Sequence, residues 1–437
     1  MSKPHIIIIG SGWAGFYLAD YLSPTLYTVT IISPRRTSAY TPLLASAACG
    51  LFNFYLAEEP IRSKSRKCRF LKATVTTISF PTKTIHCAPA FDDDSDPITN
   101  QPFDLQYDYL ILAPGCIPNT FGTPGVLDHA LFMKNVSDAM ATRKRLFDLL
   151  EKASLPTCPP ARKAELLHIA IVGGGPTGVE ITAELDDLAH RELMDLYPDV
   201  APYLHISIYD VAPHILGNYE RKLHEYANEK LVRRHVAVET NTRIEKVDRE
   251  ALYVKGKGRV PYGMLMWVTG NKATDLVMEM RDVRKSEKGL VRVLTDRHLR
   301  VFKSSGTTEA DDEVWDDVFA LGDSADIVGA SLPTTAEVAV QKAKFLVNFF
   351  NSRKEEATFE GKKAMPFTYA EKQLVSYIGS RDGIIAGRGD REGWTGRSAW
   401  LAWRSGSVMW TRSWRNRIVI LLTWILNWVF GKEIAKM

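Results

Sequence analysis

Two short glycine-rich segments carry the residue types and spacing that point most directly to chemistry. They are residues 10–15 (GSGWAG) and residues 173–178 (GGGPTG). In the pattern GxGxxG the first glycine makes a tight turn, the second lets the backbone approach a pyrophosphate, and the third lets a helix pack closely on a strand. The negative phosphates would then lie at the positive end of that helix. We therefore expect the chain to bind two dinucleotides.

The flanking residues supply the elements that such turns need. An apolar run precedes each segment, residues 6–9 (IIII) and 168–172 (HIAIV), and helices are expected over Phe16–Leu22 and from Val179. Apolar runs of this kind are typical of buried parallel strands. The same strand, turn and helix order occurring twice, 163 residues apart, predicts two Rossmann-like units.

The ends of the next strands differ between the two units. Residues 205–209 (HISIY) are followed by Asp210, after an extended helix and loop expected over 189–203. An acid at this place hydrogen-bonds ribose hydroxyls and repels a 2′-phosphate, so NADH is favoured over NADPH. In the first unit residues 27–32 (YTVTII) are followed by Ser33 instead.

A third segment indicates that one dinucleotide is a flavin. Residues 318–323 (VFALGD) predict a buried strand that ends on Asp323, with a helix from about Thr335. Asp323 can accept hydrogen bonds from a ribityl chain, or it can simply cap a turn. The helix N-terminus would stabilise an anionic reduced flavin by roughly 1–2 kcal/mol.

Composition excludes several other classes. The 437 residues allow two or three domains with buried cores. The five cysteines form no close pair, which excludes a dithiol relay and indicates a reducing compartment. The acidic segment 91–96 (FDDDSD) lacks the glycine and glutamate of a calcium loop, so no metal is expected. No basic stripe interleaved with aromatics suggests nucleic acid. The first expected strand begins so early that we expect no cleavable presequence.

The C-terminal region has the character of a membrane surface. Residues 381–437 hold ten Lys/Arg against four Asp/Glu, and seven of the ten Trp. The apolar run 418–430 (IVILLTWILNWVF) is shorter than the ~20 residues that span a bilayer. We expect a helix lying in one leaflet, or alternatively a buried dimer or core helix. The expected apolar face and its two anchors are Ile418, Leu421, Leu422, Ile425 and Trp428, with Trp414 and Trp424.

On these motifs the chain resembles the type II NADH:quinone oxidoreductases, specifically the eukaryotic alternative NADH dehydrogenases of mitochondrial membranes. The resemblance runs nearly end to end, and Ser33 is itself typical of that subgroup. It is carried by residues 32–35 (ISPR), 40–44 (YTPLL), 178–185 (GVEITAEL), 195–199 (DLYPD), 367–379 and 413–417 (SWRNR).

The resemblance implies an α/β fold of two Rossmann-like, three-layer dinucleotide-binding domains, with the NADH domain inserted in the FAD domain. The expected FAD-binding domain covers residues 1–135 and 286–365, and the NADH-binding domain covers 136–285. A membrane-anchoring region follows over 366–437.

The resemblance also implies roles for individual residues. Glu180 lies near the isoalloxazine and the nicotinamide, and Lys372 lies beside the flavin. Residues 336–341 fall on the family's AQxAxQ quinone motif, in which Glu337 and Gln341 occupy the two glutamine positions. The expected FAD-binding residues are Gly10, Gly12, Gly15, Ser33, Pro34, Arg35, Thr41, Pro42, Gly115, Gly322, Asp323 and Ala336. The expected NADH-binding residues are Gly173, Gly175, Pro176, Gly178, Asp210 and Gly270.

Glu337 departs from the family pattern, because a carboxylate in an apolar pocket is costly unless it is paired or protonated. Three explanations stay open. Glu337 pairs with Lys372 or Lys342, or it titrates with a raised pKa and donates a proton to quinone, or the acceptor is a different one. Alternatively, Gln341 and Lys342 simply face solvent on an ordinary helix.

The resulting expectation is an FAD enzyme that takes hydride from NADH and passes electrons to a ubiquinone-type acceptor without pumping protons. Two alternatives are a reductase of a non-quinone acceptor, resembling apoptosis-inducing factor, and a non-catalytic NADH-sensing membrane flavoprotein. We expect a peripheral protein on the cytosol-facing side of a mitochondrial membrane, bound through its C-terminal helix and able to form a homodimer.

Overall fold

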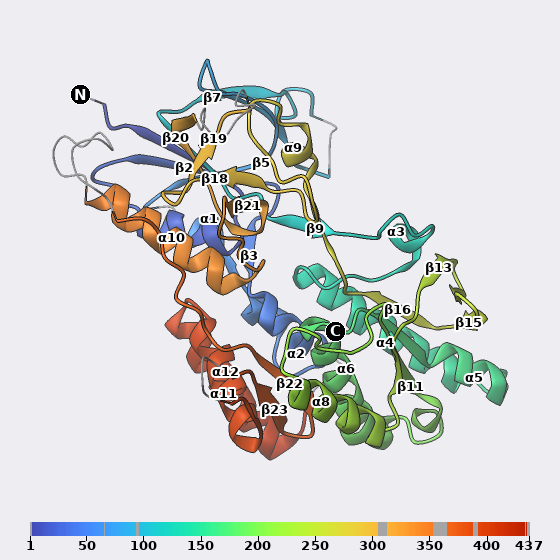
Figure 1. The fold of residues 1–437 in the computed structure, drawn as a ribbon. Helices are drawn as coiled ribbons and strands as arrows, with labels where there is room; N and C mark the ends of the chain where they lie inside the picture. Colours follow the sequence, from blue (N-terminus) through green and yellow to red (C-terminus); the bar gives the residue numbers. More distant parts are fainter. Residues whose placement is uncertain are drawn as a thin grey trace. The chain divides into compact units, whose positions relative to one another are not determined.

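The computed structural model describes residues 2–64, 66–92, 96–304, 313–352, 365–387, 392–432 and 434. Residues 93–95 of the acidic segment thus lie outside the described part. The chain divides into two compact units (Figure 1). Unit 1 comprises Met1–Ser38, Glu59–Ile117 and Asn271–Glu371, and unit 2 comprises Ala39–Glu58, Pro118–Gly270 and Lys372–Met437. This grouping follows contacts within the chain, and the domain boundaries expected above stay predictions.

Unit 1 is built on a ten-stranded sheet in the order β21-β18-β19-β20-β8-β1-β2-β5-β6-β7. Its centre, β20-β8-β1-β2-β5, is parallel. The strands in chain order are β1 (His5–Ile9), β2 (Thr28–Ser33), β5 (Arg69–Ser79), β6 (Thr84–Pro89), β7 (Phe103–Gln106), β8 (Tyr109–Leu112), β18 (Val293–Thr295), β19 (Arg300–Phe302), β20 (Val314–Ala320) and β21 (Ala325–Ile327).

The apolar run of β1 is buried on both faces, as expected of a central parallel strand. Ile6 and Ile8 pack in the cluster that contains helices α1 (Trp13–Tyr21) and α10 (Ala336–Asn351). Ile7 and Ile9 pack in a second cluster with the β5–β7 hairpins and α9 (Asp275–Glu279). Helices α1 and α10 lie side by side over the first face of this sheet (Figure 1).

Unit 2 contains a four-stranded parallel sheet in the order β12-β11-β10-β16. A separate antiparallel sheet, β13-β14-β15, packs beside it. The strands are β10 (His168–Val172), β11 (His205–Tyr209), β12 (Ala237–Glu239), β13 (Ile244–Val247), β14 (Ala251–Val254), β15 (Gly258–Pro261) and β16 (Met264–Trp267). The helices are α2 (Leu44–Ala48), α3 (Val126–His129), α4 (Val136–Ser154), α5 (Pro160–Leu166), α6 (Pro176–Leu188), α7 (Met194–Leu196) and α8 (Arg221–Arg233).

The C-terminal region also belongs to unit 2. It forms an antiparallel sheet, β22-β23-β24, followed by two helices, α11 and α12. Their bounds are β22 (Val375–Gly379), β23 (Asp382–Ile385), β24 (Trp394–Gly396), α11 (Arg397–Trp410) and α12 (Trp414–Phe430). Helix α6 packs on β22, and α11 packs on β22 and β23. Four short strands complete the chain: β3 (Thr37–Ala39), β4 (Glu58–Pro60), β9 (Cys116–Pro118) and β17 (Asn271–Ala273).

The α/β class with Rossmann-type parallel sheets is confirmed. Helices α1 and α6 begin at Trp13 and Pro176, three residues earlier than expected in each case, because each starts directly after the second glycine of its turn. The extended segment 189–203 is a π-helical turn, the short helix α7 and a 3₁₀ turn. Across the described residues no helix is both long and apolar enough to cross a membrane.

Candidate functional site

The three glycines after β1 play three different geometric roles. Gly10 has φ +100°, and a Cβ on it would lie 2.2 Å from the carbonyl oxygen of Ala113. A Cβ on Gly15 would lie 1.9 Å from the carbonyl oxygen of Gly10, so any side chain there would separate α1 from the turn. A Cβ on Gly12 would meet nothing within 4 Å. Gly12 therefore leaves open space at the N-terminus of α1, where a pyrophosphate fits.

The turn after β10 repeats this arrangement. Gly173 has φ +120°, and a Cβ on it would lie 2.7 Å from Cβ of Thr269. A Cβ on Gly178 would lie 1.7 Å from the carbonyl oxygen of Gly173, whereas one on Gly175 would meet nothing within 4 Å. Each unit thus has a glycine turn, called a cradle below, whose open centre fits the phosphates of one dinucleotide.

In both units the residue at the end of the second strand, Ser33 in β2 and Asp210 just after β11, is hydrogen-bonded to the middle of the glycine turn. In unit 1 the buried hydroxyl of Ser11 donates a hydrogen bond to Ser33 Oγ at 2.8 Å. In unit 2 the amide of Gly174, at the position of Ser11, donates to Asp210 Oδ2, and the amide of Ala212 donates to Asp210 Oδ1 at 2.7 Å. The two amides therefore hold the Asp210 carboxyl group in a fixed orientation at the edge of its cradle, and the Ser33 hydroxyl occupies the equivalent place in unit 1.

A second feature of unit 1 lies where β20 ends. Gly322 has φ +77° and opens a 3₁₀ turn over Gly322–Ser324 that presents the half-buried Asp323. The thiol of Cys116 donates to Asp323 Oδ2 at 3.2 Å, which leaves Oδ1 to accept from a ligand. Gly115, beside Cys116, has φ +72° and open space at its Cβ position. Together with the cradle at Gly12, these residues fit an extended dinucleotide such as FAD.

Helix α10 carries the residues that fall on the quinone motif. Thr335 caps it by accepting from the amide of Val338 at 3.3 Å. The Gln341 amide donates to Glu337 Oε1 at 2.6 Å, and it makes two 2.9 Å hydrogen bonds with the backbone of Ala370. Gln341 therefore does not simply face solvent, because its side chain fastens the segment around Ala370 and holds the carboxylate of Glu337.

On α10, Lys342 has the environment that differs most from the one predicted from the sequence. Its side chain is fully buried, and Nζ contacts the carbonyl oxygen of Ala325 at 3.5 Å. The expectation that Lys342 faces solvent or pairs with Glu337 is therefore wrong. It fails because position 342 lies on the face of α10 that packs against the sheet, with Ala339, Ala343 and Leu346.

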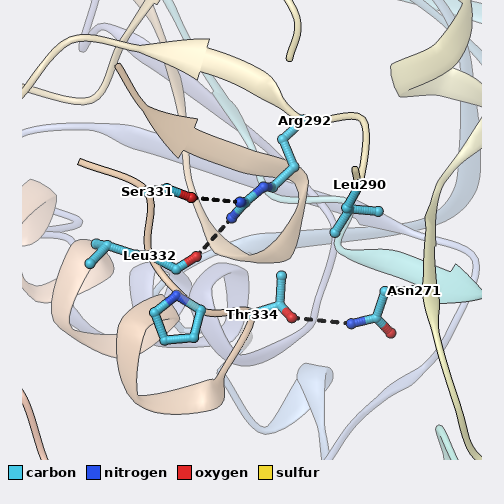
Figure 2. A pocket seen from close by; sticks show the side chains of 7 residues that line it. Asn271, Leu290, Arg292, Ser331, Leu332 and Thr334 are labelled. Atoms are coloured by element: carbon cyan, nitrogen blue, oxygen red, sulfur yellow. Dashed lines mark hydrogen bonds between the residues drawn. The ribbon is translucent and has the colours of Figure 1, made fainter. Parts of the chain in front are cut away.

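An open pocket of about 460 Å³ lies beside the start of α10 (Figure 2). Arg292 donates to the carbonyl oxygen of Leu332 at 2.8 Å and to Ser331 Oγ at 3.1 Å, and it pairs with Asp326 at 2.6 Å. Asn271 donates to Thr334 Oγ1 at 3.2 Å on the other side. These contacts fix the loop that leads into α10. None of the pocket residues was singled out from sequence, since their neighbourhood depends on strand order.

In unit 2, α6 presents a row of acids towards the C-terminal region. Trp403 Nε1 donates to Glu180 Oε1 at 3.2 Å. Burial raises the pKa of Glu180 to about 8, and the neighbouring Glu184 adds to the rise although the hydrogen bond from Trp403 lowers it. Glu184 is buried as well and accepts from Ser46 Oγ at 2.7 Å. Burial raises its pKa, which Ser46, Arg404 and Lys432 partly counter.

Asp187, one turn further along α6, is the last acid on this face of the helix. It accepts from the hydroxyl of Tyr377 and from the amide of Ser380, and it pairs with Arg234 at 2.6 Å. Glu180 was expected at the site, whereas its partners were missed. The spacing of the three acids at 180, 184 and 187, which places them on one face of the helix, is the signal that could have found them.

Helix α12 has one exposed apolar face. Trp428 is 81% exposed, whereas Ile420 on the opposite side is fully buried. The five residues predicted for the exposed face all lie on it, together with Leu426, Val429 and Phe430. Trp424 was expected to be a surface anchor and is instead half-buried, because the guanidinium of Arg404 from α11 stacks on its ring at 3.8 Å. Asn427 donates to the carbonyl oxygen of Leu51 at 3.0 Å and fastens the end of the helix.

Comparison with known proteins settles the family. The family profile described as pyridine nucleotide-disulphide oxidoreductase matches residues 4–343. The chain is 30% identical over 488 residues to the mitochondrial external alternative NADH-ubiquinone oxidoreductase of Yarrowia lipolytica, covering all of this chain and 81% of that one. It is 30% identical to a probable NADH dehydrogenase of Dictyostelium discoideum, covering 99% and 91%. The chain belongs to the alternative, type II NADH-ubiquinone oxidoreductases.

A solved structure of this family agrees. NDH2 from Plasmodium falciparum in complex with NADH superposes with a TM-score of 0.88 at 25% identity, covering 99% of this chain and all of that one. All five cysteines of the chain are free thiols, and Cys49, Cys68 and Cys87 are buried. Among the described residues no three metal-ligating side chains come together.

The remaining residues expected for this oxidoreductase family lie as follows. Pro34 and Arg35 are exposed directly after β2, and Pro176 is exposed at the first turn of α6. Thr41 and Pro42 begin a 3₁₀ turn before α2. Ala336 is the first residue of α10. Gly270 has φ +75°, and a Cβ on it would lie 2.5 Å from the ring of Phe121. Lys372 is exposed at the first position of the C-terminal segment of unit 2.

Proposed function

We propose that this oxidoreductase binds FAD in unit 1 and NADH in unit 2, and passes the electrons of NADH to a ubiquinone-type acceptor in a membrane without pumping protons. The observation that supports it most directly is the pair of glycine cradles, each open at its central glycine. The relatives are named as NADH-ubiquinone oxidoreductases, and one solved neighbour is a complex with NADH.

Different groups of the chain bind the two dinucleotides. In unit 1 the amides at the start of α1 receive the FAD pyrophosphate, and Asp323 accepts from the ribityl chain through its remaining oxygen. In unit 2 the amides at the start of α6 receive the NADH pyrophosphate, and Asp210 accepts from the ribose hydroxyls. The negative charge of Asp210 repels a 2′-phosphate, so NADH is preferred to NADPH. When bound, FAD supplies the capacity to accept a hydride and release electrons.

Three further side chains take part in the proposed reaction: Glu180 on α6, and Glu337 and Gln341 on α10. Because the pKa of Glu180 is about 8, its carboxyl group holds a proton at pH 7 and can donate it, with Trp403 keeping the carboxyl oriented. The resemblance to the family supports roles for Glu337 and Gln341 towards the acceptor and for Lys372 towards the flavin. The hydrogen bond from Gln341 to Glu337 supports a shared role for these two side chains.

Helix α12 provides the contact with the membrane. Its exposed apolar face is preceded by Arg412, Arg415 and Arg417, a pattern that favours burial in the interface of an anionic leaflet. We propose a peripheral protein on the cytosol-facing side of a mitochondrial membrane. We propose further that two copies can pair as a homodimer.

The decisive experiment is NADH oxidation by the purified, FAD-loaded protein in detergent, with and without a short-chain ubiquinone analogue. Quinone-dependent turnover with NADH well ahead of NADPH is expected. Reconstituted in vesicles, turnover should leave the internal pH unchanged. Flavin reduction by NADH without quinone turnover would contradict the acceptor assignment and favour a soluble acceptor or a sensor.

A further inference from the structure

Lys342 is the one fully buried lysine among the described residues, and nothing in the function proposed above employs it. Burying an ammonium group is costly unless it is paired, so lysine is among the residue types least often found fully buried. The contact of its Nζ with the Ala325 carbonyl oxygen, at 3.5 Å, is at the limit of a hydrogen bond. A buried charge held this loosely calls for an electrostatic explanation.

The direction of the side chain places the charge near the flavin-binding turn. Long side chains on a helix lean towards its N-terminus. From the second turn of α10, Lys342 reaches Ala325, the residue that directly follows the 3₁₀ turn Gly322–Ser324. Its ammonium group therefore lies at the base of the turn that presents Asp323.

Two acids, Asp326 and Asp323, act electrostatically on Lys342. Asp326 already has a cationic partner, because it forms an ion pair with Arg292 at 2.6 Å. It also accepts a hydrogen bond from Ser331 Oγ at 2.7 Å. Figure 2 shows Arg292 turned towards Ser331 in this arrangement. Asp323 accepts from the uncharged thiol of Cys116. Burial lowers the pKa of Lys342 to about 8, an effect that Asp326 and Asp323 oppose and Arg292 reinforces, so the ammonium form prevails at pH 7.

We propose that Lys342 is the buried counter-charge of Asp323, and that it raises the reduction potential of the flavin held at that turn. An uncompensated carboxylate beside a flavin would oppose the negative charge that reduction brings. A lysine beneath the same turn offsets that repulsion without touching the ligand. Lys342 is thus a positioning and electrostatic residue, and this role rests on the proposed binding of FAD in unit 1.

The test compares Lys342→Met with Lys344→Met in the FAD-loaded protein. Methionine matches the length of lysine without its charge, and Lys344 is an exposed lysine on the same helix. The midpoint potential of the bound flavin is measured by equilibration with a dye of known potential. We expect the ratio of reduced to oxidised flavin at a fixed potential to fall roughly fivefold or more in Lys342→Met, the order expected for a unit charge within about 10 Å. Lys344→Met should leave it unchanged.

The charge-retaining variant Lys342→Arg should keep most of the wild-type ratio if it folds. Thermal unfolding checks the fold of each variant, including Lys342→Met, which removes the proposed counter-charge of Asp323 and is therefore expected to be no more stable than the wild type. If it unfolds, Lys342→Gln takes its place with the same expected fall. An unchanged potential in a folded, charge-free variant would overturn the proposal and make Lys342 a structural residue. A wild-type protein that binds no flavin would overturn the proposed function instead.

Discussion

Trp403 Nε1 donates a hydrogen bond to Glu180 Oε1 at 3.2 Å, although the two residues lie 223 positions apart in the chain. The indole of Trp403 also stacks on Tyr377, with ring centroids 5.0 Å apart, so its donor is held in a fixed direction. The C-terminal region that carries α12 thereby reaches the carboxyl group expected at the nicotinamide.

Replacing Trp403 by Phe removes this donor and retains the stacked ring. Because the hydrogen bond lowers the pKa of Glu180, its loss should raise that pKa further. We expect the alkaline limb of quinone-dependent NADH oxidation to move to higher pH in Trp403→Phe. The measurement is a pH profile of kcat and kcat/KM. As a control, Trp400→Phe changes a neighbouring tryptophan of α11 and should leave the profile in place. An unaltered pH profile in Trp403→Phe would show that Glu180 is not the group whose titration sets the alkaline limb.

Glu180 should also make stability depend on pH. Its pKa is raised in the folded protein to about 8 from an ordinary value near 4.5, so the folded state binds the proton more tightly than the unfolded chain. Stability must then fall as the pH rises from about 4.5 to 8. Glu180→Gln removes this contribution, and we expect it to stabilise the protein at pH 8 by roughly 1–4 kcal/mol relative to its effect at pH 5. Chemical unfolding at the two pH values checks this. An equal effect at both would show that Glu180 titrates normally.

The open space at Gly12 should be occupied by ligand. We expect Gly12→Val to leave the fold intact and to lower the flavin content of the purified protein at least tenfold, because the new side chain would fill the pyrophosphate cradle. The flavin to protein absorbance ratio measures this. Gly406→Val is the control, since its Cβ position is equally open but lies on α11. Full flavin content in Gly12→Val would place the cofactor elsewhere.

Asp210 should set the choice of nicotinamide cofactor. A hydrogen bond to a charged group contributes about 1.5–3 kcal/mol, so Asp210→Asn should raise KM for NADH roughly tenfold or more and narrow the preference over NADPH. The comparison is steady-state kinetics with both cofactors. Glu239→Gln at the end of the adjacent strand β12 is the matched control and should change neither constant. Unchanged discrimination in Asp210→Asn would assign the preference to another residue.

The exposed apolar face of α12 should bind the protein to a lipid membrane. We expect the double variant Leu422→Glu, Ile425→Glu to lose binding to anionic vesicles in a sedimentation assay, because each charge opposes burial of the apolar face. Flavin reduction by NADH should stay within about twofold of the wild type. Leu155→Glu alters a leucine that is equally exposed, outside the C-terminal region, and should still sediment. Retained binding in the double variant would favour a protein partner for this face.

Local patterns made much of this structure predictable. The glycine turns are local in sequence, so the strand, turn and helix around Gly10 and Gly173 follow from a few adjacent residues. The exposed face of α12 follows from helical periodicity in the same way. Both features need only the identity of residues within one or two turns.

Contacts between distant segments were not predictable. Trp424 was misplaced because its environment is made by Arg404 from another helix. The burial of Lys342 runs against the usual behaviour of its residue type, and it depends on which face of α10 meets the sheet. The pairing of Arg292 with Asp326 depends in turn on β18 and β21 being neighbours.

Helix α12 is fastened at both ends, by Arg417 to the carbonyl oxygens of Thr411 and Met409 and by Asn427 to Leu51. After it, Lys432 pairs with Glu192 at 2.9 Å. A helix that is already folded and tethered loses little conformational entropy on meeting a bilayer, whereas a free peptide must first become ordered. The intact protein should therefore partition into lipid more strongly than a synthetic peptide of the same seventeen residues.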